Sequence, residues 1–311
     1  MLRKTIFFET LEGGKKTVVV KDISGNTHVK DPEQLLRIHT HITRQENSLA
    51  ASLPKIFGID RDRCLIRMEY IPGSTLETIL KSKLKKSRDS DPNVTETFNG
   101  LAELFAAMTR LKPSEAGMPF TPWQNRNVLS TFEPLFTRWP LRHYLPLEIN
   151  TLQKFYDKFN GQVFSRIIEN LMLVDCQPKN ILVAEGGSLR LIDMDYAVTN
   201  PALAVAHFLI SLDRLGLTRP FNFVIAKIAA WQRCFLSAFF KHSEPDFIED
   251  LAFFYPTTLL RVCNWHEKNR KWAAPYLRWY YGNRLKNYLI RLGNISFPAD
   301  GKSLANLFGG D

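Results

Sequence analysis

The stretch of this chain that most constrains its fold is residues 171–197, which read LMLVDCQPKNILVAEGGSLRLIDMDYA. Two short apolar runs, Asn180–Ala184 and Ser188–Asp193, flank a Glu-Gly-Gly turn and predict a β-hairpin. Polar side chains stand where the chain enters and leaves this hairpin. Because a hairpin returns the chain to the edge from which it started, we expect these side chains to meet at one end. They are Asp175, Asn180, Asp193 and Asp195.

These residue types suit the transfer of a phosphoryl group between two oxygens. Such a reaction needs oxygen ligands for a divalent cation and a carboxylate that aligns the acceptor hydroxyl. Asp193 can ligate the cation directly, Asn180 can add its amide oxygen, and Asp195 is a candidate second carboxylate ligand. Asp175 can orient the acceptor hydroxyl or take its proton. Lys179 either reaches the transferred phosphate or is an ordinary solvated lysine, and both interpretations remain open.

The spacing of these residues resembles that of the protein-kinase-like superfamily, specifically its branch of aminoglycoside phosphotransferases and lipopolysaccharide-core kinases. In that branch a loop H-G-D-x-x-x-x-N is followed by a strand that ends in I-D-x-[DE]. The segments Val174–Asn180 and Ile192–Asp195 match the Asp-to-Asn spacing and the carboxylate pair. The sequence departs from the pattern at Leu173, where the family has its His.

The resemblance implies an α+β, two-lobed protein-kinase-like fold. A small antiparallel β-sheet N-lobe with one helix would bind the nucleotide over residues 1–71. A larger, mainly helical C-lobe would carry catalysis and the acceptor over residues 72–311. The implied cofactors are ATP and Mg²⁺. Nothing in the chain reads G-x-G-x-x-G, so the phosphate cover is short, or Gly13-Gly14 supplies it, or the chain begins inside the usual first strand.

The first seventy residues contain the β-rich pattern that such an N-lobe needs. Lys4–Thr10 and Thr17–Ile23 are joined by a turn signal and predict a hairpin. Lys21 ends the valine-rich run of the second strand, and it resembles the lysine with which the family reaches the α- and β-phosphates. Lys30 is the alternative, because a strand at Thr27–Lys30 would also complete a five-stranded lobe. The valine-rich run favours Lys21.

A helix start follows these strands. Asp31 can act as the N-cap, a proline occupies the first helical position, and Gln34 completes a capping box, so a helix is predicted from there to about Ala51. This helix carries Glu46, which the resemblance makes the carboxylate that holds Lys21. A solvated helix carboxylate is the competing interpretation.

The next motif reads MEYIPGSTL at residues 68–76 and follows two strand-like runs. In the resembling families this segment is the interlobe hinge, whose backbone at Glu69 and Ile71 would hydrogen-bond adenine. The same Pro-Gly-Ser-Thr run is also a turn that caps a helix. The two interpretations are compatible, because a hinge is a turn that leads into a helix.

The charge of the chain bears on the acceptor. Its 311 residues carry a formal net charge of +10, and a basic surface favours anionic acceptors over polycationic aminoglycosides. Residues 261–291 interleave Arg and Lys with Trp and Tyr, a pattern that suits an anionic membrane surface or a phosphate-rich partner. A helical subdomain with aromatic residues inside and cations outside explains it equally well. Nucleic acid is not expected, because nucleic-acid binding would leave the carboxylates without a role.

The cellular setting is predicted from cysteines and hydropathy. The four cysteines form no C-x-x-C pair, the start Met1–Lys4 lacks an apolar signal region, and no run approaches the ~18 apolar residues of a membrane span. We therefore expect a cytoplasmic protein, with peripheral contact at the inner membrane as an added prediction.

These patterns predict an ATP- and Mg²⁺-dependent kinase that phosphorylates a hydroxyl, on a small molecule or a glycolipid. The favoured acceptor is a sugar of an envelope glycolipid such as lipopolysaccharide core. One alternative is a soluble small-molecule kinase of the aminoglycoside or choline type. The other is a pseudokinase-like binding module, although such a module gives no reason to keep Lys21, Asp175, Asn180 and Asp193 together.

Overall fold

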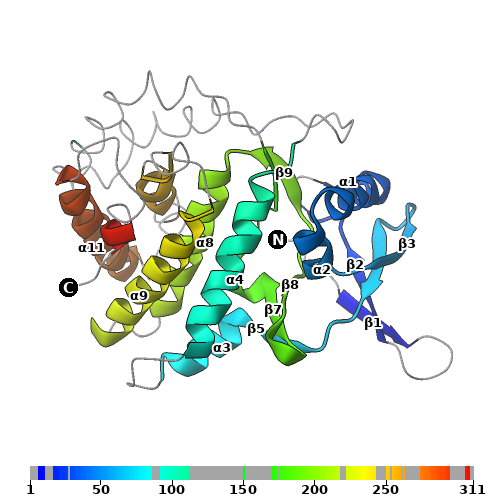
Figure 1. Ribbon diagram of the computed structural model, residues 1–311, viewed down its shortest axis with the longest axis horizontal. Helices are drawn as coiled ribbons and strands as arrows, with labels where there is room; N and C mark the ends of the chain where they lie inside the picture. Colours follow the sequence, from blue (N-terminus) through cyan, green and yellow to red (C-terminus); the bar gives the residue numbers. More distant parts are fainter. Residues whose placement is uncertain are drawn as a thin grey trace. The chain divides into compact units, whose positions relative to one another are not determined.

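A computed structural model describes most of the chain. The described residues are 6–10, 17–26, 29–85, 92–112, 150, 170–173, 175–217, 222–242, 250–252, 254–260, 262, 274–294 and 305–308. The chain divides into two units (Figure 1). The first draws on residues 1–83, 107–122 and 169–198, and the second on residues 84–106, 123–168 and 199–311. The predicted boundary after residue 71 stays a prediction.

The first unit is built on a four-stranded antiparallel sheet. Its strands are β1 (Ile6–Thr10), β2 (Thr17–Asp22), β3 (Ile56–Asp60) and β4 (Leu65–Glu69), in the order β1-β2-β4-β3. The register pairs Ile6 with Lys21 and Thr10 with Thr17, which confirms the predicted first hairpin. Val18 and Val20 are buried, as the two-residue period of a strand requires for side chains on one face.

Two helices lie between β2 and β3 in the sequence of this unit, where one was predicted. Helix α1 (Pro32–Gln45) begins as expected, because the Asp31 side chain accepts a hydrogen bond from the Glu33 N–H. It ends at Glu46, whose backbone is extended (φ −131°, ψ 104°), and α2 (Asn47–Ser52) starts anew. The prediction of one helix to Ala51 is therefore wrong. Between residues 42 and 49 every side chain is polar, so no apolar group anchors another turn.

A second, three-stranded sheet contains the hairpin from which the sequence analysis began. Its order is β5 (Gly73–Thr75), β7 (Ile181–Ala184) and β8 (Leu189–Leu191), all antiparallel, and the β7–β8 pairing confirms the predicted hairpin. β5 approaches β7 so closely that a Cβ on Gly73 would lie 2.6 Å from the Val183 carbonyl oxygen. The segment after the predicted hinge is thus bound directly to the hairpin.

Short elements complete the first unit. Strands β6 (Asn170–Leu173) and β9 (Tyr196–Thr199) pair with each other on either side of the hairpin in sequence. Between β6 and β7, a single 3₁₀ turn, η2 (Pro178–Asn180), brings the polar loop back toward the sheet. Helix α3 (Leu76–Lys83) follows β5. The unit therefore places the N-terminal sheet and the polar hairpin in one body.

The second unit is helical. It contains α4 (Pro92–Met108, apart from its last two residues), α8 (Pro201–Gly216), α9 (Asn222–Phe239), α11 (Ala274–Gly293) and the 3₁₀ turn η5 (Asn306–Phe308). α4, α8 and α9 lie side by side (Figure 1) and share an aromatic core. Phe98 and Phe105 of α4 contact Phe208 of α8, and Phe105 and Phe208 also contact Phe235 of α9. Burial of such rings supplies most of the packing energy of a unit of this kind.

The architecture confirms the predicted fold class. A small antiparallel sheet with helices and a mainly helical remainder make an α+β fold. Among the residues that the structure describes, none of the helices combines the length and the apolarity that crossing a bilayer requires.

Candidate active site

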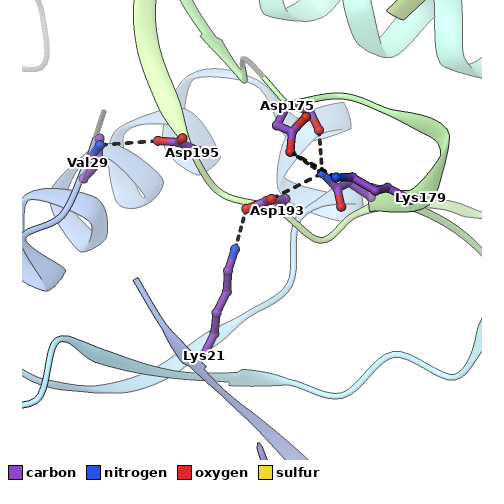
Figure 2. Close-up of polar contacts among 7 residues, drawn as sticks. Lys21, Val29, Asp175, Lys179, Asp193 and Asp195 are labelled. Atoms are coloured by element: carbon purple, nitrogen blue, oxygen red, sulfur yellow. Dashed lines mark hydrogen bonds and ion pairs between the residues drawn. The ribbon is translucent and has the colours of Figure 1, made fainter. Parts of the chain in front are cut away.

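A buried lysine meets a carboxylate at the centre of the first unit. The Nζ of Lys21, at the end of β2, donates to Oδ1 of Asp193, which follows β8 (Figure 2). Lys21 is only 3% exposed. The two residues are 172 positions apart in sequence, so the fold and not the local chain brings them together. Lys30, the rival candidate, is exposed on the loop before α1.

Asn180 connects this ion pair to Asp175. The Asn180 side-chain amide nitrogen donates to Asp193 Oδ2 at 3.2 Å and to Asp175 Oδ2 at 2.9 Å. It also donates to the Asp175 backbone carbonyl at 2.8 Å, which holds the η2 turn closed. All three bonds use the nitrogen, so the amide oxygen of Asn180 remains available as a ligand for a cation. Four predicted residues therefore form one network, as Figure 2 shows.

The Asp175 carboxylate is half-buried and well oriented. Its Oδ1 accepts from the Gln177 side-chain amide at 2.5 Å, while Oδ2 faces Asn180. The ammonium of Lys179 lies 3.9 Å from Oδ2, and its side chain is half exposed. Two amide donors fix the carboxylate in position without consuming its charge, as a group that must orient a hydroxyl requires.

Asp195 does not point at this network. Its Oδ1 accepts a hydrogen bond of 3.3 Å from the Val29 backbone N–H. In Figure 2 this bond points away from Asp193. The side chain is 3% exposed. Its oxygen is used to fix the segment that enters α1, so the geometry favours an anchoring role over the predicted second metal ligand.

Glu46 does not hold Lys21 in this structure. Its carboxylate forms a two-pronged contact with Arg110, with the Nε donating at 2.8 Å and Nη2 at 3.2 Å. Glu46 lies at the break between α1 and α2, where its backbone is extended. The predicted Lys21–Glu46 ion pair is thus replaced by Lys21–Asp193.

This placement predicts a small effect for Glu46→Gln. The Arg110 guanidinium is more than half exposed, so loss of the pair should cost no more than about 1 kcal/mol in urea unfolding. Nucleotide affinity should stay within twofold of the wild-type value. Arg110→Gln should cost the same, and the double variant should add little. A tenfold loss of nucleotide affinity in Glu46→Gln alone would contradict the assignment.

The Glu69 side chain is committed to structure. Its Oε2 accepts from Arg190 Nη2 at 2.8 Å and from the Lys55 backbone N–H at 3.1 Å, while its own N–H donates to the Lys55 carbonyl at 2.8 Å. These bonds fix the end of β4 against the hairpin through Arg190, a contact that the sequence analysis missed. The adenine-binding roles of the Glu69 and Ile71 backbone stay predictions.

Cys176 lies inside the polar loop but is no nucleophile. Its thiol is buried and lies 3.3 Å from the Leu173 carbonyl oxygen, to which it donates. Burial, together with the charges of Asp175 and Asp193, raises the pKa of this thiol far above its usual range. Thiols act as nucleophiles when ionised, so Cys176 serves as a packing residue.

A buried histidine connects α1 to the residue after Asp195. His39 Nδ1 and the Tyr196 hydroxyl lie 3.3 Å apart within hydrogen-bonding geometry. Burial lowers the pKa of His39 to about 4, so its imidazole is neutral at physiological pH. Sequence patterns did not predict this pair. Its signal was present, because residue 39 falls on the buried face of α1 with Leu35, Ile38 and Ile42.

The low pKa of His39 makes stability depend on pH. The unfolded chain takes up the proton near pH 6.5, whereas the folded chain resists it down to about pH 4. The contribution is therefore complete above pH 6.5 and is lost as the pH falls toward 4. Between pH 7.5 and pH 5 the loss should be about 2 kcal/mol in urea unfolding. His39→Gln should shrink the pH difference by that amount, and an unchanged difference would contradict the assignment.

The oxygen donors fit a magnesium ion that is held together with a nucleotide. Asp193 and Asn180 offer a carboxylate and an amide oxygen side by side. Among the described residues, no group of three or more His, Cys, Asp or Glu side chains is placed to cage a metal. Mg²⁺ at phosphate sites uses one or two carboxylates and takes its other ligands from phosphates and water. The donor set agrees with that pattern.

Comparison with solved structures identifies the fold that carries this site. No protein-family model matches the sequence, and a search of curated proteins finds no match. A solved structure of a choline/ethanolamine kinase family protein from Mesorhizobium loti is similar at 14% identity and TM-score 0.52, covering 99% of this chain and 94% of that one. The GDP and kanamycin complex of APH(2")-IIia is 17% identical at TM-score 0.52, covering 90% and 95%.

A third similar structure is the amicoumacin kinase hAmiN in complex with AMP-PNP, Ca²⁺ and Ami. It is 12% identical at TM-score 0.53, covering 91% of this chain and 86% of that one. At such identities the likeness shows the fold alone. The chain therefore has the protein-kinase-like fold that these small-molecule kinases share, which confirms the resemblance inferred from the Asp175–Asn180 loop.

Proposed function

We propose that this chain is an ATP- and Mg²⁺-dependent phosphotransferase that moves the γ-phosphoryl group to a hydroxyl. The observation that carries the proposal is the Lys21–Asp193–Asn180–Asp175 network. A buried ion pair is expensive, since the desolvation of both charges offsets their attraction and an apolar pair is often as stable. Stability alone therefore gives little reason for Lys21 and Asp193 to be buried together, whereas binding phosphate and a cation does.

Each residue of the network takes a distinct role. Lys21 would bind nucleotide phosphate oxygens with its ammonium. Asp193 and Asn180 would hold Mg²⁺. When bound, this cation would neutralise part of the charge on the phosphates. Asp175 would orient the acceptor hydroxyl and take its proton, because its carboxylate is fixed by two amides yet stays half exposed. Lys179 stays a candidate for contact with the transferred group.

The finer proposal concerns the acceptor. A net charge of +10 favours an anionic acceptor through the long-range field of the protein. We therefore propose a sugar of an envelope glycolipid such as lipopolysaccharide core, reached by peripheral contact with an anionic membrane from the cytoplasmic side. A soluble small-molecule kinase is the second candidate. The names of the similar structures, which include choline/ethanolamine and amicoumacin kinases, favour it.

A transfer screen distinguishes these acceptors. Labelled γ-phosphate from ATP with Mg²⁺ would be followed into three classes: core oligosaccharide with and without its lipid, choline and ethanolamine, and aminoglycosides. The proposal predicts transfer to the acidic saccharide and little to the polycationic aminoglycosides. Transfer to choline or an aminoglycoside alone would replace the glycolipid assignment with the second candidate. A binding module would bind nucleotide and transfer to none.

A further inference from the structure

The second unit contains a cavity of about 310 Å³ formed by α9, α11 and η5. That volume is at the lower end of the range for pockets that enclose small ligands. None of its lining residues belongs to the first unit, so it is not built from the Lys21–Asp193 network. The segment that supplies most of its wall is α11, part of the basic and aromatic stretch for which the proposed site gives no role.

The polar groups on the wall are amides and guanidinium groups. Asn283, Asn287 and Arg291 recur every four residues along α11 and so share one face of the helix, with Arg284 beside them. Asn222 faces the cavity from the first turn of α9. No carboxylate is found among the described residues that line it. Such a wall donates hydrogen bonds through its amide and guanidinium N–H groups.

Arg284 is held rigidly in this wall. Its Nη2 lies 2.6 Å from Asp213 Oδ1 and donates to Gln232 Oε1 at 2.7 Å, and the Tyr255 hydroxyl donates to the other Asp213 oxygen at 2.7 Å. Although burial opposes its charge, Asp213 keeps the pKa of Arg284 above its usual value. The buried Arg284 Nε has no hydrogen-bond partner within the described part of the chain. Leaving a buried N–H without an acceptor costs free energy. A ligand that accepts a hydrogen bond from this N–H removes that cost and so binds more tightly.

Aromatic rings form most of the rest of the wall, together with Ile225 and Leu307. Tyr255, Tyr288 and Phe308 pack against one another, with ring centroids 4.6 to 5.4 Å apart. Trp279 is 52% exposed, which leaves the indole open at the cavity. Rings beside amide and guanidinium donors match a ligand that has apolar C–H faces, hydroxyl groups and an acidic group. Apolar rings with a few placed polar groups are the usual composition of a ligand site.

From this juxtaposition we infer that the cavity binds an acidic sugar, with Asn283 and Asn287 contacting its hydroxyls and Arg284 and Arg291 its anionic group. The sugar can be free or part of a glycolipid, since the chemistry of recognition is the same. As a binding site the cavity stands on its own geometry.

The test is a calorimetric titration of the full chain without nucleotide. Glucose 6-phosphate, glucose and inorganic phosphate are the soluble probes, and a phosphorylated glycolipid in phosphatidylcholine vesicles is the lipid probe. Asn287→Asp should weaken binding of the phosphorylated sugar at least tenfold, because it adds a negative charge to the wall that holds the anionic sugar and replaces an amide donor by an acceptor. Lys286→Gln lowers the net charge by the same amount outside the cavity and should stay within twofold of wild type.

Asn283→Asp repeats the test at a second exposed position, should Asn287→Asp disturb folding. Equal binding by wild type and both aspartate variants would overturn the inference, as would inorganic phosphate binding as tightly as the phosphorylated sugar. Absence of saturable binding by every probe would also overturn it. A different outcome would separate the two proposals. If the wild type transfers no phosphate, but wild type and Asp175→Asn both bind the phosphorylated sugar, the proposed function is refuted and the cavity assignment stands.

Discussion

Asp193→Asn is expected to abolish the stabilisation of this protein by ATP with Mg²⁺. The substitution keeps the shape of the side chain but removes the charge that faces both Lys21 and the proposed cation. Nucleotide affinity in the presence of Mg²⁺ should fall at least about 100-fold, because loss of one partner of a buried charge pair costs roughly 2–5 kcal/mol. The free protein should also lose about 3 kcal/mol of stability, because the buried ammonium of Lys21 is left without its carboxylate.

The matched control is Asp195→Asn, the same change two residues later. Asp195 accepts a hydrogen bond from the Val29 backbone, so this variant should also be less stable but should keep the upward shift in Tm on addition of ATP and Mg²⁺. Thermal unfolding with ATP alone, Mg²⁺ alone and both together separates the two effects. Equal shifts in wild type and Asp193→Asn, or loss of the shift in Asp195→Asn only, would contradict the assignment of ligands.

Asp175→Asn is expected to separate binding from transfer. The variant keeps one acceptor oxygen for the amides of Gln177 and Asn180 but loses the ability to accept a proton from the acceptor hydroxyl. The rate of transfer should fall by roughly 10² to 10⁴, the usual contribution of a positioned general base. Affinity for ATP with Mg²⁺ should change by no more than threefold, since Asp193 and Lys21 remain.

Single-turnover transfer and equilibrium nucleotide binding, measured on the same preparation, check this prediction. Wild-type rates in the variant would remove Asp175 from the role of base. A parallel loss of nucleotide affinity would instead place Asp175 among the groups that bind the nucleotide. Lys179→Met in the same assays shows whether the exposed lysine at 3.9 Å contributes to transfer.

The parts of the site that the sequence predicted are those defined by local pattern. The hairpin follows from two short apolar runs around Gly186-Gly187. Both glycines adopt a positive φ of 83° in the turn. The spacing from Asp175 to Asn180 is a single loop, so its geometry depends on few residues. Lys21 could be chosen over Lys30 because a valine-rich run marks a strand with a buried face.

The parts that the sequence did not predict depend on pairing between distant segments. Glu46 binds Arg110, 64 residues away, and Asp195 binds Val29, 166 residues away. A carboxylate on a helix or at a strand end has many cations and donors within reach, so its sequence position does not determine which of them it contacts. Periodicity reports which face is buried but not which partner is met there.

The basic and aromatic stretch at residues 261–291 shows the same limit. Within the described part, Tyr280, Tyr281 and Tyr288 are buried and Trp279 is exposed, so the helical-subdomain interpretation describes most of the aromatic residues there. Alternation of cations and rings cannot by itself distinguish a membrane surface from a lined cavity. The distinction came from Arg284, whose guanidinium is fixed inside the unit by Asp213 and Gln232.

The most direct test of the proposed phosphotransferase is transfer of label from γ-labelled ATP to hydroxyl acceptors, with wild type and Asp175→Asn compared at equal nucleotide occupancy. Our interpretation predicts a phosphorylated acceptor that requires Mg²⁺, forms with the wild type and is lost in the variant. Saturable binding of ATP with Mg²⁺ without transfer to any acceptor class, or equal transfer by both proteins, would contradict it.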